Sequence, residues 1–350
     1  MLDFSTVDIK ELVIHRVGNK HNEEDFFISQ SPFELTDGLS LMILDYFVKP
    51  FMNLQESNQF THEIDLSYNE LNGICKDIFE NPDSLYINSV KVLKHLHEQS
   101  QHPHIKTGDL FVAYFDDILY QDKMVSAIGI FKSENKTSFL QIGQEDSNLE
   151  LLEQKGIDIK KLDKGCFIFN TNEDNGFSVF SVDSNNYDTE YWLNEFLGIR
   201  PTEDEIFHTK EYVNLCKGFA NEVIQSTENK TEEINFLNKS VKYLERNENI
   251  DIEEFKDEIL VDEEKKQEFD QYKSMYESQH SVAIPDAFPI SLPVVEKQKK
   301  KIKNEIKLDT NIQIKIAVNN PDSTHKFIEQ GYDHEKEMNF YKVYYNNEVK

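Results

Sequence analysis

A run of lysines near the C-terminus contains the side chains whose type and spacing best suit a specific chemistry. The last 54 residues carry 11 lysines and 8 acids, and six of these lysines lie within residues 297–307. The first 296 residues carry 26 Lys and Arg against 57 Asp and Glu. Clustered ammonium groups bind phosphates as point charges and release counterions. The run therefore predicts local binding of a polyanion by a chain whose overall net charge is −28.

The residues of this run alternate in type. Ile302, Ile306 and Leu308 are two or four positions apart, and so are Lys299, Lys301, Lys303 and Lys307. Period-2 spacing is typical of a β-strand with two unlike faces. We therefore expect a strand over residues 297–308 that packs by its aliphatic face and exposes its lysines. The candidate phosphate-binding residues are Lys299, Lys300, Lys301, Lys303, Lys307 and Lys315.

The next segment repeats the aliphatic alternation and predicts the second strand of a hairpin. Because cross-strand neighbours share a face, matching the two aliphatic faces sets the register and leaves a loop over residues 309–311. Asn311 suits the left-handed position of such a loop. The exposed face would carry lysines around one carboxylate, that of Glu305. The predicted pairs are Glu305 with Lys315, Ile306 with Ile314, Lys307 with Gln313, and Leu308 with Ile312.

Two interpretations of this hairpin stay open. In the first, the lysines bind the phosphates of a nucleic acid. Five or six phosphate contacts would then give a slope of log affinity against log salt of roughly −4 to −5. The run contains no arginine, so bidentate recognition of base edges is not expected. In the second, the lysines belong to a solvated edge strand and prevent its aggregation.

A cluster of histidines raises the possibility of a metal site. Imidazole is a common metal ligand, but residues two apart on a helix do not face each other, and no CxxC or HExxH pattern is present. We therefore expect an exposed helix end and turn, with no bound metal or other cofactor. The four residues are His95, His97, His102 and His104.

The motifs of common enzyme sites are missing from the sequence. There is no phosphate-binding glycine loop and no GxSxG pattern. Asp116 and Asp117 are conceivable hydrolase acids, but adjacent aspartates between two apolar runs favour a hairpin turn. The sequence thus favours a binding protein over an enzyme.

The elements that position these residues fall into two parts, 1–185 and 186–350, which either form two domains or pack as one unit. In the first part, apolar spacing predicts three helices. One covers residues 36–49, one begins at Ser67, and one ends at about Gln99. Successive antiparallel strands follow at 110–115, 124–131, 138–142, 166–170 and 177–182. The second part is helical for about ninety residues and closes with the basic hairpin, which a strand over 339–345 could join. The expected class is α+β.

An acidic segment within the helical part offers a second type of binding surface. Residues 251–270 hold 10 acids against 3 lysines. Such a run is either a solvated helix face or a docking surface for a basic protein.

Several features of the sequence indicate the cytoplasm. No apolar run approaches the ~20 residues of a membrane span, and the N-terminus lacks the pattern of a signal peptide. Three widely separated cysteines, Cys75, Cys166 and Cys216, fit a reducing compartment.

A set of short stretches in a fixed order resembles the bacterial 37-kDa nucleoid-associated protein family (the NdpA/YejK type). The resemblance implies a cytoplasmic protein that associates with the nucleoid and binds DNA with little sequence preference. A net charge of −28 conflicts with that expectation, so either the lysine hairpin makes the phosphate contacts locally or a protein partner recruits the chain to the nucleoid. The sequence does not distinguish DNA from RNA as the ligand. It brings no catalytic residues. The stretches are LVIHRVGNKHNEEDFFIS (12–29), GDLFVAYFDD (108–117), LDKGCFIF (162–169), DTEYWLNEFLG (188–198), IKLD (306–309), GYDHE (331–335) and FYKVYYN (340–346).

Overall fold

The computed structural model describes residues 2–145, 148–184, 191–224, 230–260, 262–316 and 327–347. The chain divides into two compact units, Met1–Thr202 and Glu203–Lys350. The first unit includes residues 191–202, because Trp192 and Phe196 pack in its core. The predicted α+β class is confirmed.

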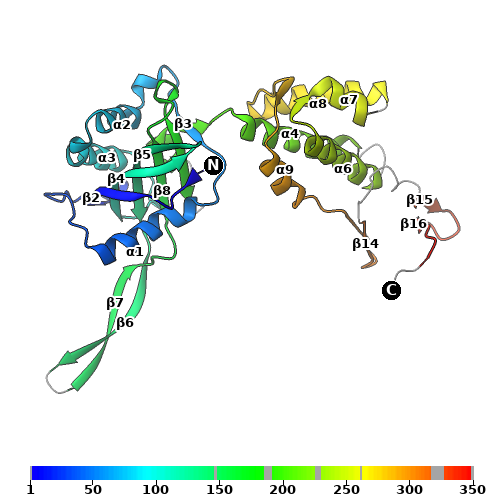
Figure 1. The fold of residues 1–350 in the computed structure, drawn as a ribbon. Coiled ribbons are helices and arrows are strands. Elements are labelled where there is room, and N and C mark those ends of the chain that lie inside the picture. Colours follow the sequence, from blue (N-terminus) through cyan, green and yellow to red (C-terminus); the bar gives the residue numbers. More distant parts are fainter. Residues whose placement is uncertain are drawn as a thin grey trace. The chain divides into compact units, whose positions relative to one another are not determined.

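An antiparallel sheet organises the first unit (Figure 1). Its strand order is β1-β4-β5-β8-β9-β3-β10, with β2 paired to β4. The strands are β1 (Leu2–Asp3), β2 (Asp8–Val17), β3 (Asn58–Phe60), β4 (Gly108–Tyr120), β5 (Lys123–Ser133), β8 (Lys164–Phe169), β9 (Ser178–Asp183) and β10 (Ile199–Pro201).

Helices cover both faces of this sheet. On one face α2 (Glu70–Glu80) and α3 (Leu85–Gln99) bury Val112 and its alternate neighbours, and on the other α1 (Asp37–Val48) packs on Phe111. A π-helix, Tyr191–Leu197, adds Trp192 to the first of these cores. Alternate residues of one strand therefore serve two cores, which explains why the strands are apolar almost throughout.

Two local predictions for this unit were wrong. Asp116 and Asp117 do not form the hairpin turn, because β4 continues through a bulge there to the turn at Gln121–Asp122. Helix α2 begins after Asn69, whose side chain accepts a hydrogen bond from the Asn72 amide at 2.9 Å. Ser67 lies instead in a 3-10 turn.

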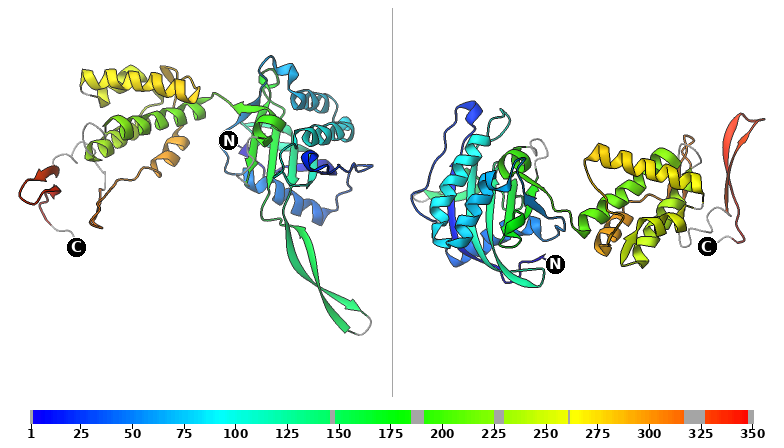
Figure 2. Two further views of the ribbon diagram at one scale, coloured as in Figure 1. Left: turned by 180° about the vertical axis from the view of Figure 1, so that it is seen from behind. Right: turned by 90° about the horizontal axis from the view of Figure 1, so that it is seen from above.

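A two-stranded arm projects from the first unit (Figure 2). It consists of β6 (Lys136–Glu145) and β7 (Asn148–Ile157), which pair only with each other among the described strands. The sequence predicted a short strand at 138–142 and missed β7. Glu150 and Glu153 lower the strand propensity of β7, which hides its pattern.

The second unit is a bundle of helices around Phe219, Phe255 and Phe269. A short ladder joins β11 (Asn249–Asp251) to β12 (Ala287–Pro289). The helices are α4 (Glu205–Phe219), extended by a π-helical segment Ala220–Ile224, α6 (Lys230–Arg246), α7 (Ile252–Ile259), α8 (Glu263–His280) and α9 (Leu292–Lys299).

Two hairpins follow α9. One pairs β13 (Glu305–Lys307) with β14 (Gln313–Lys315), and the other pairs β15 (Ile328–Asp333) with β16 (Met338–Val343). The strand expected over 339–345 therefore pairs with β15 and, in the described residues, does not join the basic hairpin.

Candidate nucleic-acid interface

The lysine run begins in a helix, so the strand predicted over 297–308 is wrong for its first part. Pro293 stands in the first turn of α9, and Val294, Val295 and Gln298 are buried. This spacing of three and four is helical, and it places Lys299 on the exposed side. Strand geometry is confined to Glu305–Lys307.

The hairpin register agrees with the prediction. Ile306 pairs with Ile314, and Glu305 and Lys307 pair with Lys315 and Gln313. The Leu308 amide donates to the Ile312 carbonyl at 2.9 Å, and Asn311 is left-handed with φ 61°. The matched aliphatic face thus set the register, as expected.

Side chains of α6 help to hold this hairpin. The Asn238 amide donates to Asn304 Oδ1 at 2.8 Å, directly before β13. Ile306 is buried, whereas every candidate lysine is exposed. The hairpin therefore packs by its aliphatic side and presents its ammonium groups to solvent.

Two of the six candidate lysines are held by carboxylates. Lys299 Nζ lies 2.6 Å from Glu245 Oε1, and Lys307 Nζ lies 3.2 Å from Glu305 Oε1. The hydrogen bond from Lys307 lowers the pKa of Glu305. For the other four lysines, no ion pair forms within the described part of the chain. These four are Lys300, Lys301, Lys303 and Lys315.

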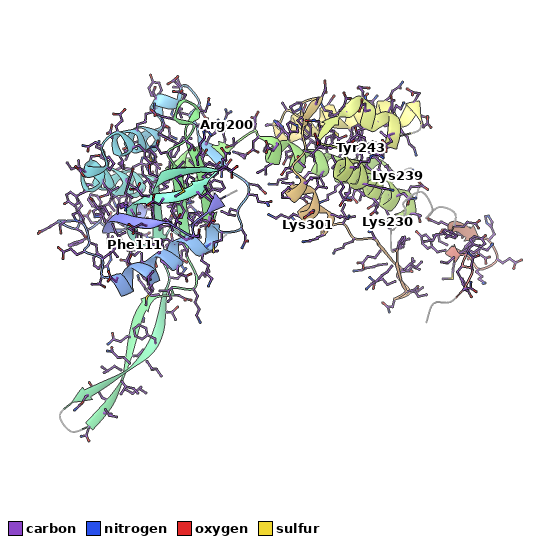
Figure 3. All side chains as sticks on the ribbon, in the orientation of Figure 1. Phe111, Arg200, Lys230, Lys239, Tyr243 and Lys301 are labelled. Carbon is purple, nitrogen blue, oxygen red and sulfur yellow. The ribbon has the colours of Figure 1, made fainter. Side chains whose placement is uncertain are left out.

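Two lysines from helices α4 and α6 lie beside the run, and the sequence reasoning missed them. Lys217 donates to Gln298 Oε1 at 2.8 Å, and its pKa is lowered by burial and by the charge of Lys301. Lys242 lies on α6 between Asn238 and Glu245, on the face that contacts α9 and β13. Figure 3 labels Lys301 after α9, and Lys230 and Lys239 on α6. Only the packing of helices distant in sequence brings these groups together.

The four histidines are dispersed. His95 hydrogen-bonds the Phe196 carbonyl at 2.9 Å and contacts Glu70 at 3.0 Å, while His97 hydrogen-bonds the Glu24 carbonyl. The rings of His102 and His104 meet edge to face in the following turn, with centroids 5.0 Å apart. Within the described ranges, no three His, Cys, Asp or Glu side chains are placed to hold a metal ion.

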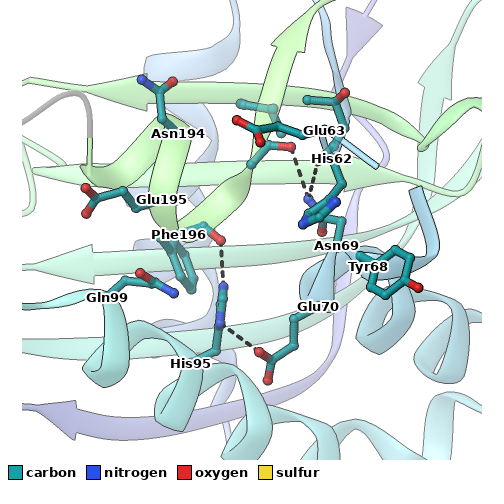
Figure 4. A pocket seen from close by; sticks show the side chains of 13 residues that line it. His62, Glu63, Tyr68, Asn69, Glu70, His95, Gln99, Asn194, Glu195 and Phe196 are labelled. Carbon is teal, nitrogen blue, oxygen red and sulfur yellow. Dashed lines mark hydrogen bonds and ion pairs between the residues drawn. The ribbon is translucent and has the colours of Figure 1, made fainter. Parts of the chain in front are cut away.

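A cleft of about 520 Å³ lies beside His95 in the first unit (Figure 4). Its lining includes the carboxylates of Glu63, Glu70 and Glu195. Carboxylates repel phosphate, so this cleft does not suit a nucleic-acid backbone.

Two ion pairs are buried in the first unit around Tyr191. Lys132 Nζ lies 2.9 Å from Glu134, and Lys164 Nζ lies 2.6 Å from Asp183. Both ammonium groups also lie over the Tyr191 ring, at 5.6 and 5.3 Å from its centroid. These side chains are almost fully buried, and we interpret the network as structural.

The fold and the candidate lysines together define an α+β protein of two units, which exposes a group of lysines although its net charge is −28. A comparison with protein-family models matches residues 13–339 to the family described as nucleoid-associated protein YejK. The chain belongs to this family, which is not a known enzyme family, and the resemblance found in the sequence motifs is confirmed.

A search of curated proteins returned no match. Of the helices described, none is both long enough and apolar enough to cross a membrane.

Proposed function

We propose that this nucleoid-associated protein binds DNA with little sequence preference through a basic cluster at α9 and the β13–β14 hairpin. The cluster is defined as Lys299, Lys300, Lys301, Lys303, Lys307 and Lys315. The observation that carries the proposal is the exposure of all six side chains, four of which form no ion pair within the described residues. The proposed location is the cytoplasm, at the nucleoid, and no cofactor or catalysis is invoked.

The net charge of −28 does not prevent local binding. At physiological salt, exposed charges more than about 8 Å apart are largely screened from each other. A phosphate beside the basic cluster therefore interacts mainly with the nearby lysines. Lysine holds phosphates without reading base edges, which supports binding with little sequence preference and leaves RNA as an alternative ligand.

The test is DNA binding by the purified full chain across a salt series. One variant changes Lys300, Lys301, Lys303 and Lys315 to Gln. A matched control changes four exposed lysines of the first unit to Gln: Lys94, Lys123, Lys160 and Lys161. Each lost phosphate contact should reduce the salt slope by ~0.9, so the cluster variant should lose about 3 to 4 units of slope and the control almost none. Equal losses in the two variants would contradict the proposal.

A second candidate function is recruitment to the nucleoid by a basic protein that docks on α7 and α8. The observation that favours it is the exposure of acids in this segment: Glu253 and Glu263 are 78% and 79% exposed at their side chains. Under this alternative, wild-type protein alone would not bind DNA at low salt. The cluster variant would then localise to the nucleoid as the wild type does.

A further inference from the structure

The β6–β7 arm has two unlike faces. The ladder runs from Lys136 opposite Ile157 to Glu145 opposite Asn148 without a bulge. Opposite residues share a face and successive residues alternate, so the even residues of β6 share a face with the odd residues of β7. We call this the apolar face of the arm.

Four aliphatic side chains are exposed together on the apolar face. Ile142 lies opposite Leu151, and Leu140 and Leu149 occupy the adjoining rows. These four side chains belong to residues that are 66–75% exposed. At the same level the opposite face carries Gln141, Glu150 and Gln154 together with Phe139 and Leu152. Of these two apolar residues, Phe139 is 51% exposed and Leu152 is partly buried. The exposed aliphatic residues of the arm are therefore concentrated on one side of a projecting element.

An arm of this kind is poorly stable in water when it stands alone. An isolated two-stranded hairpin is marginal, and contiguous exposed aliphatic groups mark an interaction surface. The arm leaves the body of the first unit (Figures 1 and 2), and its aliphatic groups remain exposed. A second surface that covers the apolar face would stabilise both the arm and the assembly.

We propose that this second surface is the apolar face of the same arm in another copy of the chain. The four aliphatic residues lie in three cross-strand pairs, and the other two members of these pairs are Glu153 and Gln144. A charged partner would therefore gain little binding energy at the centre of the patch. An isologous contact matches aliphatic groups with aliphatic groups by symmetry alone. Glu153 and Lys155 flank the patch, one of each sign, so two copies meet without a surplus of like charge on this face.

The area of the patch fits a weak, reversible dimer. Each aliphatic side chain offers roughly 100 Å² of apolar surface, so the eight side chains of a pair bury about 800 Å². The flanking residues raise this toward the lower limit of stable interfaces, about 1,200 Å². We therefore expect an equilibrium between monomer and dimer that depends on protein concentration.

Salt should strengthen this dimer. Two copies, each with a net charge of −28, repel each other at low ionic strength, and salt screens that repulsion. An apolar contact does not depend on ion pairs that salt would weaken. The expected salt dependence is opposite in sign to that of phosphate binding by the basic cluster, and this separates the two proposals.

The test is sedimentation equilibrium of the full chain over a range of protein concentrations and at low and high salt. Two neighbouring residues of β6 provide matched variants, Ile142→Asp on the apolar face and Gln141→Asp on the other face. Both add one negative charge to exposed positions of the arm. Because a symmetric interface contains each change twice, Ile142→Asp should weaken the dimer by roughly 100-fold or more. Gln141→Asp should leave it nearly unchanged.

Three outcomes would overturn the proposal. The first is a wild-type chain that stays monomeric at every concentration and salt level. The second is equal weakening by the two variants, which would indicate pairing along the strand edges instead of the apolar face. The third is a dimer that dissociates as salt rises. The variant that replaces four lysines of the basic cluster should dimerise normally. Failure of the DNA-binding proposal can therefore be distinguished from failure of the dimer proposal.

Discussion

Replacing Lys164 with Met should destabilise the first unit strongly. The side chains of Lys164 and Asp183 are 2% and 3% exposed, and their charged atoms are 2.6 Å apart. Removing the ammonium group breaks this ion pair and leaves a carboxylate in a buried site. Breaking a buried pair in this way costs about 3–5 kcal/mol, a large share of the stability of an ordinary domain.

The assay uses the only tryptophan of the chain. Trp192 is fully buried in the first unit, so its fluorescence during urea unfolding reports on that unit alone. The free energy of unfolding from this transition should fall by about 3–5 kcal/mol in Lys164→Met. Lys160→Met, at an exposed position of the same unit, should change it by less than ~0.5 kcal/mol.

A double variant shows whether the loss comes from the buried charge. Replacing Lys164 with Met and Asp183 with Leu removes both charges and should restore most of the lost stability, because apolar substitutes for a buried pair are often neutral. The reasoning is refuted if the single variant loses less than ~1 kcal/mol. It also fails if the losses of the two single variants simply add, since residues in contact should couple.

Three further predictions concern individual side chains. Asn69→Ala removes the cap of α2 and the amide that donates to the Leu197 carbonyl at 3.1 Å, and should cost about 1–3 kcal/mol in the same urea assay. Burial raises the pKa of Cys216 to about 12, so its thiol should resist alkylation at pH 8 in the native chain and react in urea, as measured by mass spectrometry. Glu305→Gln removes the carboxylate that holds Lys307, and should raise DNA affinity a few-fold at low salt by titration; unchanged affinity would argue against a contact from Lys307.

The hairpin register could be predicted because each of its strands repeats one aliphatic pattern. Ile306 and Ile314 must share the buried side, and a shift by one residue would expose them. The start of the lysine run could not be predicted in this way. Lysines on the exposed side of α9 fit both helical and strand spacing, and the buried Gln298 gave no apolar signal for the helix.

Other features depend on packing between residues that are far apart in sequence. Lys217 and Lys242 lie in helices α4 and α6, and nothing in their local sequence places them beside the lysine run. The bulge at Asp117, with φ 60°, interrupts β4 without ending it, whereas the aspartates alone suggested a turn. Local patterns thus identified the elements better than the contacts between them.

The two proposals, taken together, make a prediction that neither makes alone. One basic cluster with five or six phosphate contacts gives a salt slope of roughly −4 to −5. A dimer that engages DNA with both of its clusters should double this slope to about −8 to −10, and its apparent affinity should exceed that of a monomer through avidity. Ile142→Asp, which leaves every lysine in place, should then halve the slope measured at protein concentrations where the wild type is dimeric. If Ile142→Asp separates the dimer but leaves the slope unchanged, each dimer engages DNA through one cluster at a time.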